Sequence, residues 1–241
     1  MAWTAAHRTQ RPPMLKKTRT SATPCLRKAR KFLSITFPFA RRLPSAAPSP
    51  RSQGDLRFMH PGIHAAKNPE KPAYILAGSG ETVTYGQLEA RSNQGAQLFR
   101  ALGLKTGDHI AIMMENHPAF FAICWAAQRA GLYYTAISYR LQEEEVAYIV
   151  EDCEAKVFIT TAAQRDLAQR LAPRLKVHRF MLDGTTDGFE SWETAVDGQP
   201  VTPIGDETEG ADMLYSSGTT GRPKGIKLPL SGEPLGNAGG L

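Results

Sequence analysis

Cysteine is scarce in this sequence. The 241 residues include three cysteines, Cys25, Cys124 and Cys153, which lie far apart and form no C-x-x-C pair. Disulfide-stabilised scaffolds usually have an even set of cysteines, so this number and spacing indicate no disulfide framework. They favour a reducing compartment, and we predict a cytoplasmic protein. Cys124 lies in the apolar run FFAICWAA, where we expect a buried core thiol and not a nucleophile.

Long hydrophobic runs are also lacking. The apolar run FLSITFPFA at residues 32–40 is short for a secretory signal, contains Pro38 and is followed at once by Arg41 and Arg42. A membrane-spanning helix needs about 20 predominantly apolar residues. The sequence therefore predicts no transmembrane segment.

Acidic residues are almost absent from residues 1–58, which contain 13 Lys and Arg side chains and one acid, Asp55. The formal charge of the whole chain is +6, so residues 59–241 carry a net charge of −6. The basic character of the chain therefore belongs to its N-terminal segment. Because the remainder is acidic, it has no general attraction for polyanions, and we expect no specific nucleic-acid partner.

The composition separates the chain into two regions. Residues 1–58 are basic and rich in Pro, Ser and Arg, whereas patterned sequence begins at Met59. We predict a disordered extension over residues 1–58 and a folded domain over residues 59–241. Two other interpretations stay open: an organellar transit peptide cleaved near Ala47, whose composition would be similar, and a start of translation at Met59.

Clustered metal ligands are lacking as well. His60 and His64 have the i, i+4 spacing of a helical metal site, but no third ligand lies nearby, and we expect both to be surface residues. Glu143, Glu144 and Glu145 stand at the beginning of an expected helix, where negative charge favours the N-terminal end of the helix dipole. We predict no metal site at either place.

From Met59 onward, short apolar strands alternate with helical patterns. A capping box at Thr84 and Gln87 predicts the start of a helix that ends before Gly103, and Gly131 predicts the end of a second, largely apolar helix. Repeated β-α units of this length indicate an α/β fold in which helices flank a parallel sheet. Strands are expected at residues 73–77, 81–85, 109–114, 133–138, 155–160, 178–183 and 211–215, and helices at 84–102, 117–130, 142–153, before 171 and around 192.

After a polar linker at residues 198–210, the strand at 211–215 leads into the stretch LYSSGTTGRPKGI at residues 214–226. Its hydroxyls, glycines and lysine suit the oxygens of a polyphosphate. Lys224 is followed by Gly225 and not by Ser or Thr, so this is no Walker A loop. A plain Ser/Gly hairpin loop is the alternative interpretation. The candidate phosphate-binding residues are Ser216, Ser217, Gly218, Thr219, Thr220, Gly221 and Lys224.

The stretch YSSGTTGRPKG at residues 215–225 resembles the phosphate-loop motif of the adenylate-forming acyl-CoA synthetases and matches it at every position. Two earlier stretches, at residues 83–112 and 128–138, are also similar to blocks of this family. The resemblance runs in order from about Met59 to Leu230. It implies an incomplete N-terminal domain of an acyl-CoA synthetase-like fold.

The resemblance further implies a two-step ligase that uses ATP, Mg²⁺ and coenzyme A. In this family a carboxylate, expected here to come from a fatty acid, attacks the α-phosphate of ATP and gives an acyl-adenylate and pyrophosphate. The thiol of coenzyme A then displaces AMP. The candidate loop residues would hold the β- and γ-phosphates, acting through position and charge.

The sequence departs from the family after the phosphate loop. Residues 226–241 contain no counterpart of the motifs that supply the family's metal-binding Glu, ribose-binding Asp and catalytic Lys. We expect the N-terminal part, or a truncated form, of a synthetase, without ligase activity of its own. A non-catalytic remnant or interaction piece with at most weak ATP binding is the second interpretation. The carboxylic acid and the oligomeric state stay open.

Overall fold

The computed structural model describes residues 60–216 and 221–236. The chain divides into two units, Met1–Ala47 and Pro48–Leu241, and every described residue belongs to the second unit. The expected extension at residues 1–58 and the loop residues 217–220 lie outside the described residues.

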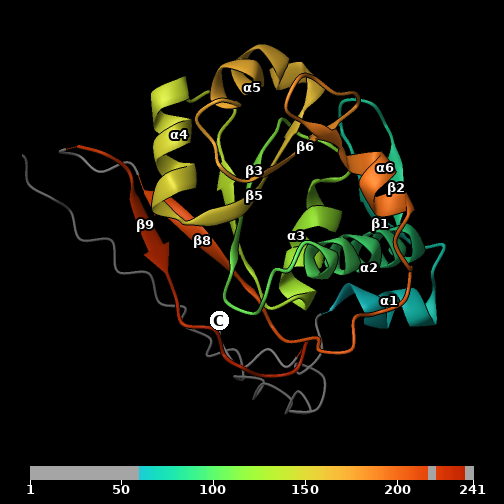
Figure 1. Ribbon diagram of the computed structural model, residues 1–241. Helices are drawn as coiled ribbons and strands as arrows, with labels where there is room; N and C mark the ends of the chain where they lie inside the picture. The colour runs from blue at the N-terminus through green and yellow to red at the C-terminus, as the bar shows by residue number, and fades with distance from the viewer. Residues whose placement is uncertain (1–59, 217–220, 237–241) are drawn as a thin grey trace, which may run out of the picture. The chain divides into compact units, whose positions relative to one another are not determined.

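A seven-stranded sheet forms the centre of the described domain (Figure 1). Its strands lie in the order β7-β6-β5-β3-β4-β8-β9 and pair in parallel, except for the antiparallel pair of β8 and β9. The predicted α/β class with a parallel sheet is confirmed. The strands are β3 (His109–Met113), β4 (Tyr133–Ile137), β5 (Ala155–Thr161), β6 (His178–Leu182), β7 (Glu190–Ser191), β8 (Ala211–Ser216) and β9 (Lys224–Lys227); β1 (Pro72–Ile75) and β2 (Thr82–Thr84) form a separate antiparallel pair.

Helices cover both faces of this sheet, and each face has its own hydrophobic core. One core contains side chains from α2, α3 and α6, and the other contains side chains from α4 and α5. The helices are α1 (Pro61–Lys67), α2 (Tyr85–Ala101), α3 (Phe120–Arg129), α4 (Glu143–Asp152), α5 (Arg165–Leu171) and α6 (Trp192–Asp197), with a 3-10 turn, η1 (Ala162–Gln164), before α5.

The central strand β3 shows why the sequence folds in this way. Its five residues are all buried. Ile110 and Ile112 belong to the core with α2 and α3, whereas Ala111 and Met113 belong to the core with α4. Successive side chains of a strand point to opposite faces, so a strand that is apolar at every position must be covered on both sides.

The path of the chain reverses at β3. It passes from β3 through α3 to β4 on one side, and then through α4 to β5 on the other side of β3. Because parallel crossovers are right-handed, this reversal places α3 and α4 on opposite faces of the sheet. Sheets of this kind bind ligands outside the carboxyl ends of the strands at the point of reversal.

Local signals in the sequence are confirmed at both ends of α2 and after α3. The hydroxyl of Thr84 accepts the N–H of Gln87 at 3.2 Å, and the Gln87 side chain accepts the N–H of Thr84 at 2.9 Å. Gly103 follows the helix with φ +82°. Gly131 has φ +64°, and a Cβ there would lie 2.4 Å from the methyl carbon of Thr208.

The prediction that His60 is a surface residue is wrong. Its side chain caps α1, where Nδ1 accepts the N–H of Gly62 at 3.1 Å, and its ring packs edge-on against Trp125 at 5.1 Å between centroids. Burial lowers the pKa of His60 to about 4. His64 is exposed. Within residues 60–216 and 221–236, no group of three His, Cys, Asp or Glu side chains could hold a metal ion.

Both cysteines in the described part of the chain are buried and unpaired, as expected for Cys124. Burial raises the pKa of Cys124 to about 12 and that of Cys153 to about 11, which disfavours the thiolate that a nucleophile needs. Among the helices of the described residues, none is both long and apolar enough to cross a membrane.

The polar segment at residues 198–210 is attached to the domain more closely than its composition suggests. Ile204 is buried in the core beside α2. Arg100 forms an ion pair with Asp206, and Arg129 forms one with Glu207. These contacts fix the chain just before it enters β8.

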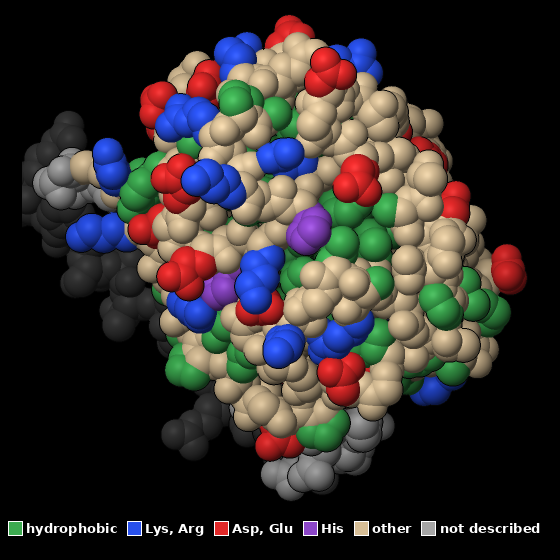
Figure 2. Space-filling model, viewed as in Figure 1, with side chains coloured by type: hydrophobic (Ala, Val, Ile, Leu, Met, Phe, Trp, Pro, Cys, Tyr) green, Lys and Arg blue, Asp and Glu red, His purple; other side chains and the backbone are tan. Residues whose placement is uncertain are grey.

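Charges of both signs are distributed over the face shown in Figure 2, where Lys and Arg side chains are interspersed with Asp and Glu. The segments α4 and α5 illustrate this mixing, because Glu143 pairs with Arg170 and Arg174. The glutamates at the start of α4 therefore neutralise nearby cations as well as the helix dipole.

We propose that the folded domain begins near Met59 and that the basic segment before it adds no stability. A chain that begins at Met59 should unfold at the same urea concentration as the full chain, because the core side chains among the described residues all come from residue 88 onward. Urea unfolding followed by tryptophan fluorescence tests this. A markedly lower midpoint for the shorter chain would show that residues 1–58 are structural.

Candidate phosphate-binding hairpin

The candidate phosphate loop joins the last two strands of the sheet. Ser216 ends β8, Lys224 begins β9, and the two residues are direct partners in the antiparallel ladder. The loop is therefore part of a β-hairpin, and the two strands of this hairpin carry the side chains of Ser216 and Lys224. Ser217, Gly218, Thr219 and Thr220 lie outside the described residues.

The described members of the loop are open to solvent. Ser216, Gly221 and Lys224 are all exposed, and the side chain of Lys224 has no hydrogen-bond or ion-pair partner among the described residues. A free ammonium group beside a hydroxyl can bind an anion without first breaking an existing pair. Both groups lie on one face of the hairpin, because cross-strand partners share a face.

Gly221 does not need to be glycine for the backbone conformation seen here. Its φ is not positive, and a Cβ at this position would meet no atom within 4 Å. Any requirement for glycine must come from a ligand that approaches the backbone closely.

The hairpin lies at the ligand-binding edge of the sheet. β8 is parallel to β4, so the carboxyl ends of β3, β4 and β8 share one edge. A cleft of about 1040 Å³ opens at the ends of β3 and β4. Its lining includes the aromatic rings of Phe120, Phe121 and Tyr139 and the polar side chains of Glu115 and Ser138. This is the position expected for a ligand crevice in a sheet whose strand order reverses.

Strand β9 is held in place by contacts between residues that lie far apart in the sequence and could not be predicted from it. The ammonium of Lys227 lies 2.8 Å from Nε2 of His109 and 4.4 Å from the ring centroid of Tyr133. The hydroxyl of Tyr133 donates to the carbonyl of Leu228 at 2.6 Å. Burial and the Lys227 charge lower the pKa of His109 to about 4, so the neutral ring accepts a hydrogen bond from Lys227.

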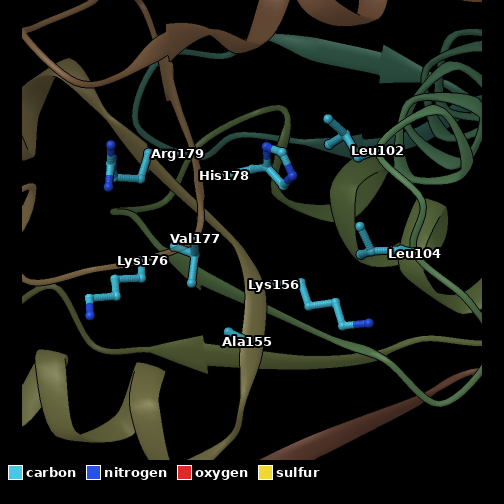
Figure 3. A pocket seen from close by; sticks show the side chains of 8 residues that line it. All are labelled: Leu102, Leu104, Ala155, Lys156, Lys176, Val177, His178 and Arg179. Atoms are coloured by element: carbon cyan, nitrogen blue, oxygen red, sulfur yellow. The ribbon is translucent and has the colours of Figure 1, made fainter.

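A second cleft, of about 520 Å³, lies at the opposite edge, near the start of β5 and β6 (Figure 3). Two of its three Lys and Arg side chains are already engaged, because Lys156 pairs with Asp108 at 2.7 Å and Arg179 donates to three backbone carbonyls. Lys176 and Arg179 also point away from Lys156 in Figure 3. Since these charges do not converge, we do not consider this cleft a phosphate site.

Comparison with known proteins identifies the family. The model of the AMP-binding enzyme family matches residues 63–232, which include both described arms of the hairpin. The chain therefore belongs to the AMP-binding enzyme family.

Two relatives indicate the range of the similarity. Long-chain fatty acid transport protein 2 of Rattus norvegicus is 32% identical over 177 residues, which are 68% of this chain and 28% of the relative. The long-chain-fatty-acid–CoA ligase FadD13 of Mycobacterium tuberculosis is 29% identical over 164 residues, which are 67% of this chain and 32% of the relative. The chain thus spans about a third of the length of these relatives.

A solved structure supports the fold. The anthranilate CoA ligase AuaEII, crystallised with anthranoyl-AMP, superimposes with a TM-score of 0.61 at 24% identity. The match covers 70% of this chain and 34% of that one. At this identity the likeness concerns the fold, and it confirms the expected acyl-CoA synthetase-like α/β fold over part of that chain's length.

Proposed function

We propose that residues 59–241 are the phosphate-binding part of an AMP-forming acyl-CoA synthetase. The observation that carries the proposal is the hairpin of β8 and β9, which presents Ser216 and Lys224 at the carboxyl edge of the sheet, with the Lys224 side chain unpaired among the described residues. In the parent reaction a carboxylate attacks the α-phosphate of ATP and releases pyrophosphate to give an acyl-adenylate, and the thiol of coenzyme A then takes the acyl group and releases AMP. Both relatives named above are called long-chain fatty acid proteins, which favours a fatty acid as substrate.

In this proposal the loop holds the β- and γ-phosphates of ATP. The ammonium of Lys224 supplies the positive charge, Ser216 and the hydroxyls of Ser217, Thr219 and Thr220 donate hydrogen bonds, and the backbone at Gly218 and Gly221 lets a phosphate come close. Such a site accelerates adenylation by orienting the leaving pyrophosphate and stabilising its charge.

We propose that the parent reaction uses Mg²⁺ and coenzyme A. Mg²⁺ would accompany the phosphates of ATP, but we assign no metal ligand, because no suitable cluster occurs within the described residues. Coenzyme A would act as the acceptor thiol, and no residue is assigned to it.

We also propose a reducing compartment, such as the cytoplasm, because Cys124 and Cys153 are free thiols. We propose no nucleic-acid partner.

The loop assignment predicts a loss of activity on substitution. The C-terminal portion of a close relative, fused after residue 230, should give carboxylate-dependent exchange of labelled pyrophosphate into ATP. In this hybrid, Lys224→Ala should lower the exchange rate by roughly 10²–10³-fold, because one charge that stabilises the departing phosphates is removed. Gly221→Val should also lower it strongly, by blocking close approach of a phosphate.

A matched control separates the loop from general effects of charge. Lys176 is an exposed lysine at the opposite edge of the sheet, so Lys176→Ala should leave exchange unchanged. Unchanged exchange in both the Lys224 and Gly221 variants would refute the assignment of the loop. A hybrid that shows no exchange at all, although it is folded, would favour the non-catalytic interpretation.

A further inference from the structure

One carboxylate on α4 receives two tyrosine hydroxyls. Asp152, the last residue of α4, accepts a hydrogen bond from Tyr215 at 2.5 Å through Oδ2 and one from Tyr148 at 3.1 Å through Oδ1. Tyr148 lies one turn earlier in the same helix, whereas Tyr215 lies in β8, 63 positions along the chain from Asp152. Asp152 therefore ties the end of β8 to α4, as the adjacent positions of these elements in Figure 1 allow.

The path of the Tyr215 side chain explains a glycine of the motif. Tyr215 and Gly225 are partners in the ladder of β8 and β9. A Cβ on residue 225 would lie 3.1 Å from Cζ of Tyr215 and 2.4 Å from the terminal methyl of Met213. The ring of Tyr215 thus lies over Gly225, and its hydroxyl extends beyond the glycine to Asp152. A side chain at residue 225 would displace the tyrosine ring.

The loop itself reaches the same helix. The guanidinium of Arg222 stacks on the ring of Tyr148 with its central carbon 5.1 Å from the ring centroid. Since Tyr148 also donates to Asp152, the strand before the loop and a residue within the loop are both linked to one carboxylate. Cation–π stacking on a ring fixed by its own hydrogen bond restricts the position of Arg222.

We propose that Asp152 is a positioning residue for the phosphate loop. Tyr215 and Gly225 share the face of the hairpin that docks toward α4, whereas their neighbours Ser216 and Lys224 lie on the opposite face. By fixing the docked face, Asp152 sets the direction in which Lys224 presents its ammonium. The attachment of the hairpin to α4, here called the docking, does not depend on any ligand. Only the effect of Asp152 on phosphate binding rests on the proposed function.

Hydrogen–deuterium exchange on the ligand-free 241-residue chain tests the docking. Asp152→Ala should make the amides of residues 214–226 exchange roughly tenfold faster, because a hydrogen bond to a charged group is lost. Tyr215→Phe should act in the same way, and Asp152→Asn, which keeps one acceptor oxygen, should give an intermediate rate. Amides of β3 and β5 should not change, since Asp152 is exposed and outside both cores.

Two controls remove the same chemical groups elsewhere. Tyr74→Phe deletes a hydroxyl that donates to the carbonyl of Pro118 at 2.6 Å, and Asp197→Ala deletes a carboxylate paired with Arg91. Neither should change exchange at residues 214–226. Exchange there that is equal in the unsubstituted chain, Asp152→Ala and Tyr215→Phe would overturn the proposal. If Asp152→Ala does not fold, Tyr215→Phe still decides it.

Titration with magnesium pyrophosphate, followed by calorimetry on the same chain, tests the consequence for the ligand. Asp152→Ala should weaken binding about three- to tenfold, and Lys224→Ala should weaken it more. If Lys224→Ala leaves binding unchanged, or if the unsubstituted chain binds no pyrophosphate at millimolar concentration, the proposed function fails while the exchange data still decide the docking. If Lys224→Ala weakens binding and Asp152→Ala does not, the positioning role fails alone.

Discussion

Replacing Arg129 by alanine should lower the free energy of unfolding by about 3 kcal/mol. The side chain is 1% exposed and joins three parts of the domain: Nη2 lies 2.7 Å from Glu89 on α2, and Nη1 lies 3.0 Å from Glu207 in the segment before β8. It also donates to Asn93. Removing the guanidinium leaves two partly buried carboxylates facing each other without a cation, which is the costly way to break a buried ion pair.

Urea unfolding at pH 7 measures this loss. Arg91→Ala is the matched control, because Arg91 forms an ion pair with Asp197 in which both side chains are more than half exposed. Such surface pairs contribute at most about 1 kcal/mol. The cost of Arg129→Ala should also shrink as the pH falls toward 5, since burial already raises the pKa of Glu207 and protonation would relieve the repulsion. A cost for Arg129→Ala as small as that for Arg91→Ala would contradict the role of this network.

The parts of the fold that could be predicted from the sequence are those with a local cause. The capping box of Thr84 and Gln87 marks the start of α2 because both partners lie within four residues of each other. Strand β3 was predicted because a short apolar run between polar turns is typical of a buried strand. The order of these units along the chain then implies the parallel sheet, since each crossover must return to the same edge.

Strand β9 could not be predicted in the same way. Its four residues, Lys224–Lys227, are all exposed and include two lysines and a glycine, so neither period nor propensity marks a strand. It becomes a strand because its backbone pairs with β8 and because Lys227 contacts His109, which lies 118 positions away along the chain. Pairing of this kind is a property of the folded structure and leaves no local pattern.

The kind of ligand that the candidate site binds could be predicted from the sequence, whereas the residues that hold the site in position could not. The hydroxyls, glycines and Lys224 of the loop indicate phosphate binding by residue type alone, and that assignment stays a prediction. Asp152 carried no signal, because an acid at the end of an amphipathic helix is an ordinary surface residue until Tyr215 is brought to it. The same holds for His60, whose burial depends on Trp125 and could not be inferred from its spacing to His64.

A second large effect should appear on mild acidification. His60 and His109 are buried, and the pKa of each is lowered to about 4, in both cases chiefly by burial and then by a nearby cation, Arg129 or Lys227. In the unfolded chain a histidine has a pKa near 6.5. Between these values the unfolded state binds more protons than the folded state, so the free energy of unfolding must fall as the pH is lowered from about 6.5 to 4. Each histidine should contribute a loss of up to about 2 kcal/mol between pH 7 and pH 5.

Urea unfolding at a series of pH values between 7 and 4 tests this, and substitution assigns the effect. The double variant His60→Gln and His109→Gln should be less stable at pH 7, because the contacts with Trp125 and Lys227 are lost, yet its stability should change much less between pH 7 and pH 5. Gln keeps polar groups at both positions and cannot titrate. His64→Gln serves as the control, since His64 is an exposed histidine on the same helix, and it should retain the pH dependence of the unsubstituted chain. An unsubstituted chain equally stable at pH 7 and pH 5, or a double variant with an undiminished slope, would show that protonation of these two rings does not limit the stability of the domain.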